Sequence, residues 1–363
     1  MKKIIFGKTF EIRFPPSHES LVSETFALYT DAGASPVDVS VEIGIKQVSE
    51  TVYFNNPKIH FTYPHGMETR FPQTSVRWYP CVNEGPALRV SIDIHECYQG
   101  GVLRKILSPE FPTCIEWFQQ VVHELLLIPA VYFLRDLAPI HAACVSLGDK
   151  VVAFTGTGGV GKSSAMLAFR KYSSASFLSD DILIVDPGGN AYGNMAWPKI
   201  YGYNLTDPLL KSQVFFERGL FDRLLFEVRR RINPARVRRK VKPDRLYEAV
   251  APDGMPLTHI VNLVRGTGRD CEVRELAPET LARMSELVLF PEYAVFHQHL
   301  YWEEYNALAG GAAPALTMGE VIERWREVWS ECFGAVCLRN VMVPASMDQD
   351  TLMSRLEDLV GNF

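Results

Sequence analysis

The feature that most restricts how this chain can fold is a glycine-rich segment, G-T-G-G-V-G-K-S, at residues 156–163. A short apolar run, 151–155, precedes it, and a helical pattern over about 161–171 follows it. Glycine accepts backbone angles that a Cβ forbids, so successive N–H groups can turn inward and surround phosphate oxygens. A strand, this loop and a helix in that order predict an α/β domain that binds a nucleoside triphosphate.

Backbone and side chains are expected to share the binding of this nucleotide. Lys162 would place its charge on the β- and γ-phosphates, and the Ser163 hydroxyl would bind Mg²⁺. The predicted nucleotide-binding set is Gly156, Thr157, Gly158, Gly159, Val160, Gly161, Lys162, Ser163 and Ser164. Nothing in the loop reads a base, so ATP and GTP both remain open.

Two adjacent carboxylates, Asp180 and Asp181, stand between two apolar runs that are typical of strands. Acids at the end of a strand in such folds commonly hold Mg²⁺, and a second carboxylate can act as a general base. A solvated turn is the alternative, since paired aspartates also favour turns. His141 precedes the loop and is, by itself, compatible with a core histidine or a catalytic one.

Together these three features resemble the catalytic core of the HPr kinase/phosphorylase family. The matching residues are P-I-H-A-A-C-V-S-L-G-D-K-V-V-A-F-T-G-T-G-G-V-G-K-S-S at 139–164 and F-L-S-D-D-I-L-I-V at 177–185. Within the family, the chain is similar to the HPr-kinase-related proteins often found in peptide-modification clusters. The resemblance covers about 137–200 and implies the P-loop fold shared with phosphoenolpyruvate carboxykinase.

The resemblance also implies a role for each matching residue. Asp180 would be the general base that takes the proton of an acceptor hydroxyl, with His141 beside it. Asp181 and Ser163 would hold Mg²⁺, and Lys162 would neutralise the transferred phosphoryl group. The downstream acid and the N-x-P-V-x-P-G-R type loop of the true HPr enzymes are not recognisable here, so we expect neither phosphorolysis nor HPr as the substrate.

The remaining patterns predict how the chain is divided. Short alternating runs with turn clusters, such as 37–45 and 88–94, indicate strands, and we expect a further strand at 26–29. Thr113 begins a helix that Pro129 should kink or break. The predicted division is a β-rich N-terminal domain over 1–110, a connecting helix over 111–136 and a P-loop catalytic domain over 137–363 with helical insertions near 205–250 and 276–330.

A basic run at 229–245 contains nine Lys and Arg and one acid, although the whole chain has a net charge of −5. Because Pro234 and Pro243 disfavour a helix, we expect a loop that closes over nucleotide or substrate, with a solvated surface as the alternative. The candidate phosphate contacts are Arg236, Arg238, Arg239 and Arg265. Aromatic residues that would stack on bases are absent from the run, so nucleic acid is not expected as a partner.

Other residue groups argue against further metals and against a membrane. The cysteines, at 81, 97, 114, 144, 271, 332 and 337, are odd in number and scattered, which predicts free thiols in a reducing compartment. His297 and His299 stand near Glu303 and Glu304, but alternate residues of a helix face different ways, so we expect no metal there. No stretch is apolar for long enough to span a bilayer, and we expect a cytoplasmic protein.

The function we expect is a kinase that uses ATP or GTP with Mg²⁺ to phosphorylate a hydroxyl, preferably Ser or Thr of a peptide or protein. Two alternatives remain open. One is a kinase for a small molecule such as free serine or a sugar, and the other is a nucleotide-binding switch that transfers nothing. The resembling family commonly forms rings, so self-association also stays open.

Overall fold

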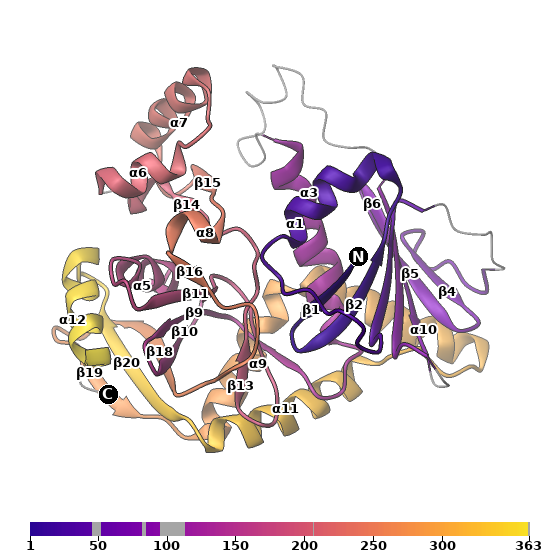
Figure 1. The fold of residues 1–363 in the computed structure, drawn as a ribbon. Coiled ribbons are helices and arrows are strands. Elements are labelled where there is room, and N and C mark those ends of the chain that lie inside the picture. The colour runs from indigo at the N-terminus through magenta and orange to yellow at the C-terminus, as the bar shows by residue number, and fades with distance from the viewer. Residues whose placement is uncertain (46–51, 82–84, 95–112, 206, 362–363) are drawn as a thin grey trace.

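The computed structural model describes residues 1–45, 52–81, 85–94, 113–205 and 207–361. The chain is a mixed α/β protein with two seven-stranded sheets (Figure 1). One sheet contains the first strands of the chain, and the other contains the glycine-rich segment. The described residues also form a four-stranded and a two-stranded sheet.

The β-rich N-terminal part expected from the sequence is present as one sheet in the order β1-β2-β3-β7-β6-β5-β4. In β3 the side chains alternate between buried and half-buried, which matches the alternating pattern. The strand expected at 26–29 is wrong, because Glu19–Phe26 form helix α1, whose buried residues Val22, Thr25 and Phe26 have helical spacing. The strands are β1 Lys2–Ile5, β2 Lys8–Arg13, β3 Val39–Ile43, β4 His60–Tyr63, β5 Gly66–Phe71, β6 Thr74–Pro80 and β7 Leu88–Ile94.

The connecting helix begins as expected but ends earlier. The Thr113 side chain accepts a hydrogen bond from the N–H of Glu116 at the start of α3 (Cys114–Val122). A π-helical segment, His123–Leu127, follows and leads into α4 (Ile128–Val131). The helix is therefore not broken at Pro129. We attribute this to the wide π turn before the proline, which relieves the ring's clash with the preceding turn.

The second large sheet carries the glycine-rich segment at its centre. Its order is β16-β11-β9-β10-β18-β20-β19, with β10, β18 and β20 parallel to one another. The first of these strands corresponds to the apolar run at 151–155. Helix α5 (Lys162–Phe169) packs on β9 and β10, and α12 (Gln349–Gly361) packs on α5. The strands are β9 Ala142–Leu147, β10 Lys150–Thr155, β11 Ala175–Ser179, β16 Ala249–Val250, β18 His259–Gly266, β19 Glu272–Glu275 and β20 Cys337–Pro344.

Two chain segments cross from this sheet into the four-stranded sheet at the same level. Strand β8 (Ala138–Ile140) lies in the four-stranded sheet, and one residue later β9 lies in the large one. Strand β11 likewise gives way to β12 (Leu183–Val185). Because β11 pairs with β9 and β12 pairs with β8, the two crossings face each other. The four-stranded sheet also contains β13 Asn190–Tyr192 and β17 Met255–Pro256.

The two regions predicted as helical insertions have different surroundings. In the first, α6 (Pro208–Val214) and α7 (Leu220–Ile232) form a hairpin that stands away from the two seven-stranded sheets in Figure 1. In the second, α10 (Ala294–Gly310) packs on β4 and β5 of the N-terminal sheet, so these late residues help cover the first strands. The remaining helices are α8 Pro243–Leu246, α9 Pro278–Glu292 and α11 Met318–Gly334, with single 3₁₀ turns at Pro16–His18 and Gly202–Asn204.

The basic run does not form the loop that its prolines led us to expect. It spans the end of α7, strand β15 (Arg238–Lys240) and the short helix α8. Strand β15 pairs with β14 (Lys199–Tyr201). The prolines are accommodated because Pro234 lies in the turn after α7 and Pro243 lies in the first turn of α8.

The described residues bear on two expectations from the sequence, the lack of a membrane-spanning helix and the presence of free cysteines. None of the described helices combines the length and the apolar character needed to cross a bilayer. The six described cysteines are all free thiols, as expected, and Cys97 lies outside the described residues.

A matched pair of glycines tests the geometry of the loop. Gly156 has a φ of +128°, and a Cβ there would lie 2.4 Å from the carbonyl oxygen of Leu263. A Cβ at Gly158 would meet no atom within 4 Å. We expect Gly156→Ala to lower the free energy of unfolding by about 2 kcal/mol or more, and Gly158→Ala to change it by less than about 0.5 kcal/mol. Urea denaturation measures both, and equal stability of the two variants would contradict this loop geometry.

Candidate functional site

The glycine-rich loop turns sharply between β10 and α5. Gly156, Gly159 and Gly161 all have positive φ, at 128°, 79° and 114°, so the loop depends on glycine at these positions. The Lys162 ammonium folds back over the loop and donates to the carbonyl oxygens of Gly156 (2.8 Å) and Thr157 (2.9 Å). The predicted loop residues therefore follow a strand and open a helix, with the lysine charge held above them.

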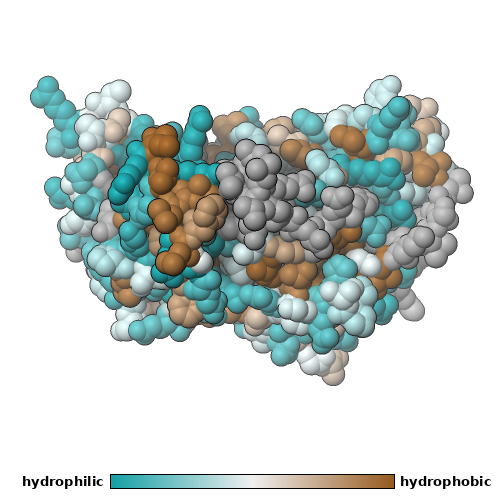
Figure 2. All heavy atoms as spheres, turned by 90° about the horizontal axis from the view of Figure 1, so that it is seen from above, coloured by the Kyte–Doolittle hydropathy of each residue, from teal (hydrophilic) through white to brown (hydrophobic). Residues whose placement is uncertain are grey.

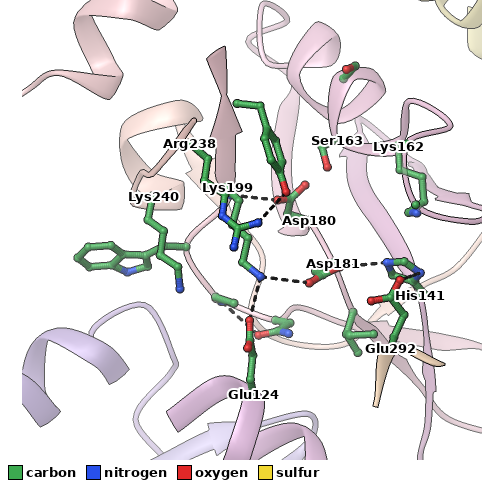
Figure 3. A pocket seen from close by; sticks show the side chains of 18 of the residues that line it. Glu124, His141, Lys162, Ser163, Asp180, Asp181, Lys199, Arg238, Lys240 and Glu292 are labelled. Carbon is green, nitrogen blue, oxygen red and sulfur yellow. Dashed lines mark hydrogen bonds and ion pairs between the residues drawn. The ribbon is translucent and has the colours of Figure 1, made fainter. Parts of the chain in front are cut away.

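A cavity of about 800 Å³ lies beside this loop (Figure 3). The loop and the start of α5 form one wall, and the two strand crossings form its floor. The opposite wall comes from the π-helical segment and from the β14–β15 pair. Eleven of the sequence-predicted residues line the cavity, namely His141, Gly158, Gly159, Gly161, Lys162, Ser163, Ser164, Asp180, Asp181, Arg238 and Arg265.

The two aspartates have exchanged the partners that the resemblance implied. His141 Nε2 lies 3.0 Å from Oδ1 of Asp181, whereas it was expected beside Asp180. Asp180 instead accepts a hydrogen bond from the backbone N–H of Lys199 at 3.2 Å, and it interacts with the Ser163 hydroxyl. Successive side chains of an extended segment point to opposite sides, so adjacent aspartates at a crossing contact different neighbours.

Asp180 is placed to receive a cation. Burial raises the pKa of its carboxyl group, the Ser163 hydroxyl partly offsets that rise, and the neighbouring Asp181 charge adds to it. Its Oδ1 atom is buried and receives no hydrogen bond within ordinary limits from any described residue. A carboxylate oxygen left in this state is costly unless a positive group approaches it.

Asp181 has the opposite electrostatic character. Partial removal from bulk water in the cavity would raise its pKa, but the hydrogen bond with His141 and the charge of Lys199 hold that pKa well below its ordinary value. The Lys199 ammonium is 3.8 Å from Oδ2 of Asp181, and the Asp181 side chain is 52% exposed. Asp181 is therefore a charged carboxylate that is accessible from the cavity.

Sequence reasoning missed the charged groups that distant elements bring to the cavity. Glu124 comes from the π-helical segment and pairs with Lys199 at 2.9 Å. Glu292, from the end of α9, has Oε1 at 3.9 Å from Nδ1 of His141. Lys240, from β15, is buried and lines the cavity wall that the β14–β15 pair forms. Glu124 left a signal as a charge inside an otherwise apolar stretch, and Lys240 lies within the basic run, whereas Glu292 left none.

The four candidate arginines lie in different surroundings. Arg238 and Arg265 line the cavity, where Arg238 donates to the Tyr201 hydroxyl at 3.0 Å. Arg239 is buried and its guanidinium binds Asp222 at 2.6 and 3.2 Å, so its expected phosphate contact is replaced by a structural ion pair. Arg236 is exposed and does not line the cavity.

The metal-ligating potential of the described residues is limited. They contain no group of three or more His, Cys, Asp or Glu side chains arranged to hold a metal ion. Ser163 and Asp180 nevertheless suit Mg²⁺, which usually takes one or two protein oxygens and completes its shell with phosphate and water. His297 contacts the Tyr132 hydroxyl, and His299 contacts His60, so these two histidines have different partners.

Comparison with known proteins assigns the chain to no family. The sequence matches no protein-family model, and it has no significant match among curated proteins. The function has to be inferred from the residues of the cavity.

Lys240 provides a test of the cavity's electrostatics. Burial lowers the pKa of Lys240 to about 7, whereas a hydrogen bond to Glu357 raises the pKa of exposed Lys171. Only a neutral amine reacts with acetic anhydride, so we expect the acetylation rate of Lys240 to reach half its maximum near pH 7. The rate at Lys171 should still rise above the ordinary pKa of lysine, about 10.4. Mass spectrometry of peptides from pulse-labelled protein measures both, and parallel pH profiles would contradict the prediction.

Proposed function

We propose that this protein is a kinase that transfers the γ-phosphoryl group of a Mg²⁺-bound nucleoside triphosphate to a hydroxyl group, with Ser or Thr of a peptide or protein as the acceptor. One observation carries the proposal: the Lys162 loop, the Asp180–Ser163 pair and the Asp181–His141 pair all face one cavity. The resemblance of residues 137–200 to the HPr kinase/phosphorylase core supports it. A P-loop fold of that type is part of the same proposal.

The triphosphate would occupy the loop side of the cavity. The loop's backbone N–H groups and the first turn of α5 suit phosphate oxygens, and Lys162 supplies a positive charge. Ser163 and Asp180 would hold the Mg²⁺ that accompanies the nucleotide, which would neutralise charge on the phosphates. This assignment gives Asp180 the metal-binding role that the resemblance implied for Asp181.

The acceptor hydroxyl would approach Asp181 from the opposite side. Asp181 would accept the hydrogen bond of the hydroxyl, orient its oxygen for in-line attack and take its proton. The new P–O bond would form as the bond from the γ-phosphorus to the β–γ bridging oxygen breaks, which releases the nucleoside diphosphate. His141 would hold the carboxylate in position through its 3.0 Å contact. Because the pKa of Asp181 is low, its main contribution would be orientation, and the proton would move late in the transfer.

The proposed roles of the two aspartates can be distinguished by two substitutions, each of which removes one negative charge. We expect Asp181→Asn to lower kcat by about 100-fold or more and to change the KM for MgATP by less than about twofold, because only acceptor activation is lost. Asp180→Asn should raise the Mg²⁺ concentration needed for half-maximal rate. Transfer of radiolabelled γ-phosphate to a pooled library of Ser- and Thr-containing peptides measures both.

The matched control is Asp270→Asn, an exposed aspartate outside the cavity, which should leave both constants unchanged. Free serine and sugars are assayed in parallel as acceptors. Preferential labelling of these compounds would replace the peptide kinase by a small-molecule kinase. Nucleotide binding without transfer to any hydroxyl would instead indicate a switch, and an unaltered kcat in Asp181→Asn would refute the assigned role of Asp181.

A further inference from the structure

Helix α7 presents a continuous apolar surface that no described part of the chain covers. Its exposed side chains include Leu220, Leu224, Val228 and Ile232, which are 79%, 66%, 50% and 79% exposed. Their spacing of four residues places them along one side of a helix about 20 Å long. Phe221 lies on the same side and is 59% exposed. We call these five residues the α7 stripe.

The stripe is larger than ordinary surface exposure explains. Single exposed apolar side chains are common on folded proteins, whereas contiguous apolar patches mark binding surfaces. In α7 only Phe226 is buried, so the helix directs most of its apolar residues away from the protein. In Figure 2, which looks down on the α6–α7 hairpin, apolar side chains gather where the hairpin stands.

The hairpin is fixed rigidly to the wall of the cavity. Asp222 of α7 forms the buried ion pair with Arg239, and the Arg239 guanidinium also lies 5.1 Å from the ring centre of Phe226. Arg218, just before α7, pairs with Glu116 of α3 at 2.7 Å. Arg239 lies in β15 between two residues that line the cavity. A chain bound along α7 would therefore have a fixed position relative to the cavity.

The charges around the stripe indicate what kind of partner it fits. Between Arg218 and Arg245 there are eleven Lys and Arg and three Asp and Glu, and without the buried Arg239 and Lys240 the basic residues still outnumber the acidic ones by nine to three, although the whole chain has a net charge of −5. Arg231 follows Leu224 by seven residues and so projects from the same side of α7. Arg229 borders the stripe. A surface that is apolar along its centre and basic at its border complements a helix that is apolar along one face and acidic beside it.

We propose that the α7 stripe docks an acidic amphipathic helix of the polypeptide that carries the acceptor hydroxyl. The identity of the docked chain as acceptor rests on the proposed function, whereas the docking itself does not. The observations favour a helix over an anionic membrane, because the basic charge is confined to this region and the rest of the chain is acidic. A flat anionic surface would attract the hairpin but repel the remainder.

The test uses synthetic helical peptides as probes and the full-length protein. The first peptide, about 16 residues long, carries a leucine stripe flanked by Glu. The second has Lys in place of each Glu, and the third has Ser in place of each Leu. We expect the acidic leucine peptide to bind at least about tenfold more tightly than either of the others, as measured by fluorescence anisotropy.

A double variant and a matched control locate the binding. Leu224→Asp with Val228→Asp should weaken binding of the acidic peptide by about tenfold or more. Leu308→Asp removes an equally exposed leucine from α10 and should leave the affinity within about twofold. Circular dichroism and the affinity for MgATP check that each variant is folded.

Several results would overturn the proposal. They are no binding of the acidic peptide, equal binding of the basic peptide, or binding that survives the double variant. Preferential binding to vesicles with about 30% phosphatidylserine would replace the helix by a membrane surface. A concentration-dependent dimer that the double variant abolishes would replace it by a second copy of this chain. Peptide binding without phosphoryl transfer would leave the docking intact and remove only the proposed function.

Discussion

The candidate site depends on two antiparallel chain segments that leave one sheet and enter another at the same level. Strand β9 pairs with β11 on one side of the crossing, and β8 pairs with β12 on the other. These pairings fix His141 opposite Asp181, with neither side chain committed to a sheet interior. Strand β10 pairs with β9, so the same arrangement also sets where the glycine loop begins. One set of backbone hydrogen bonds thereby positions both halves of the site.

The electrostatics of the cavity follow from this placement. Two carboxylates adjacent in sequence acquire opposite character, because burial raises the pKa of Asp180 whereas His141 and Lys199 hold down that of Asp181. Neighbouring acids with divergent environments are a common way to divide binding and proton transfer between two groups. In the proposed kinase, Asp180, whose pKa is raised, would bind the Mg²⁺, and Asp181, which stays charged, would bind the acceptor hydroxyl.

Local sequence patterns predicted the elements whose structure is determined by residues that are neighbours in the sequence. The glycine loop, β10 and α5 are contiguous in sequence, and the alternation of buried residues in β3 is visible in the letters themselves. The strand expected at 26–29 failed because aromatic residues there are buried on a helical spacing, which packing decides. The π-helical segment before Pro129 has no sequence signal that we could read.

The full set of residues that forms the site was harder to predict from the sequence, because it depends on contacts between residues that are distant in the chain. The sequence identified His141, Asp180 and Asp181 as candidates. Which of the two aspartates pairs with His141 is set by the side of the strand crossing to which each side chain points. Glu292 belongs to a helix more than a hundred residues later, so no spacing rule connects it with His141. The sequence predicted Arg239 as a phosphate contact, but Arg239 pairs with Asp222, which lies 17 residues earlier.

The central claim is that the loop around Lys162 binds a nucleoside triphosphate, and a calorimetric titration with MgATP tests it most directly. We expect one binding site per chain and a loss of affinity of about tenfold or more in Lys162→Met. Lys171→Met, which removes an exposed lysine just after α5, should bind like the wild type. Equal affinity of the wild type and Lys162→Met, or no binding by the folded wild type, would show that this loop does not bind the triphosphate.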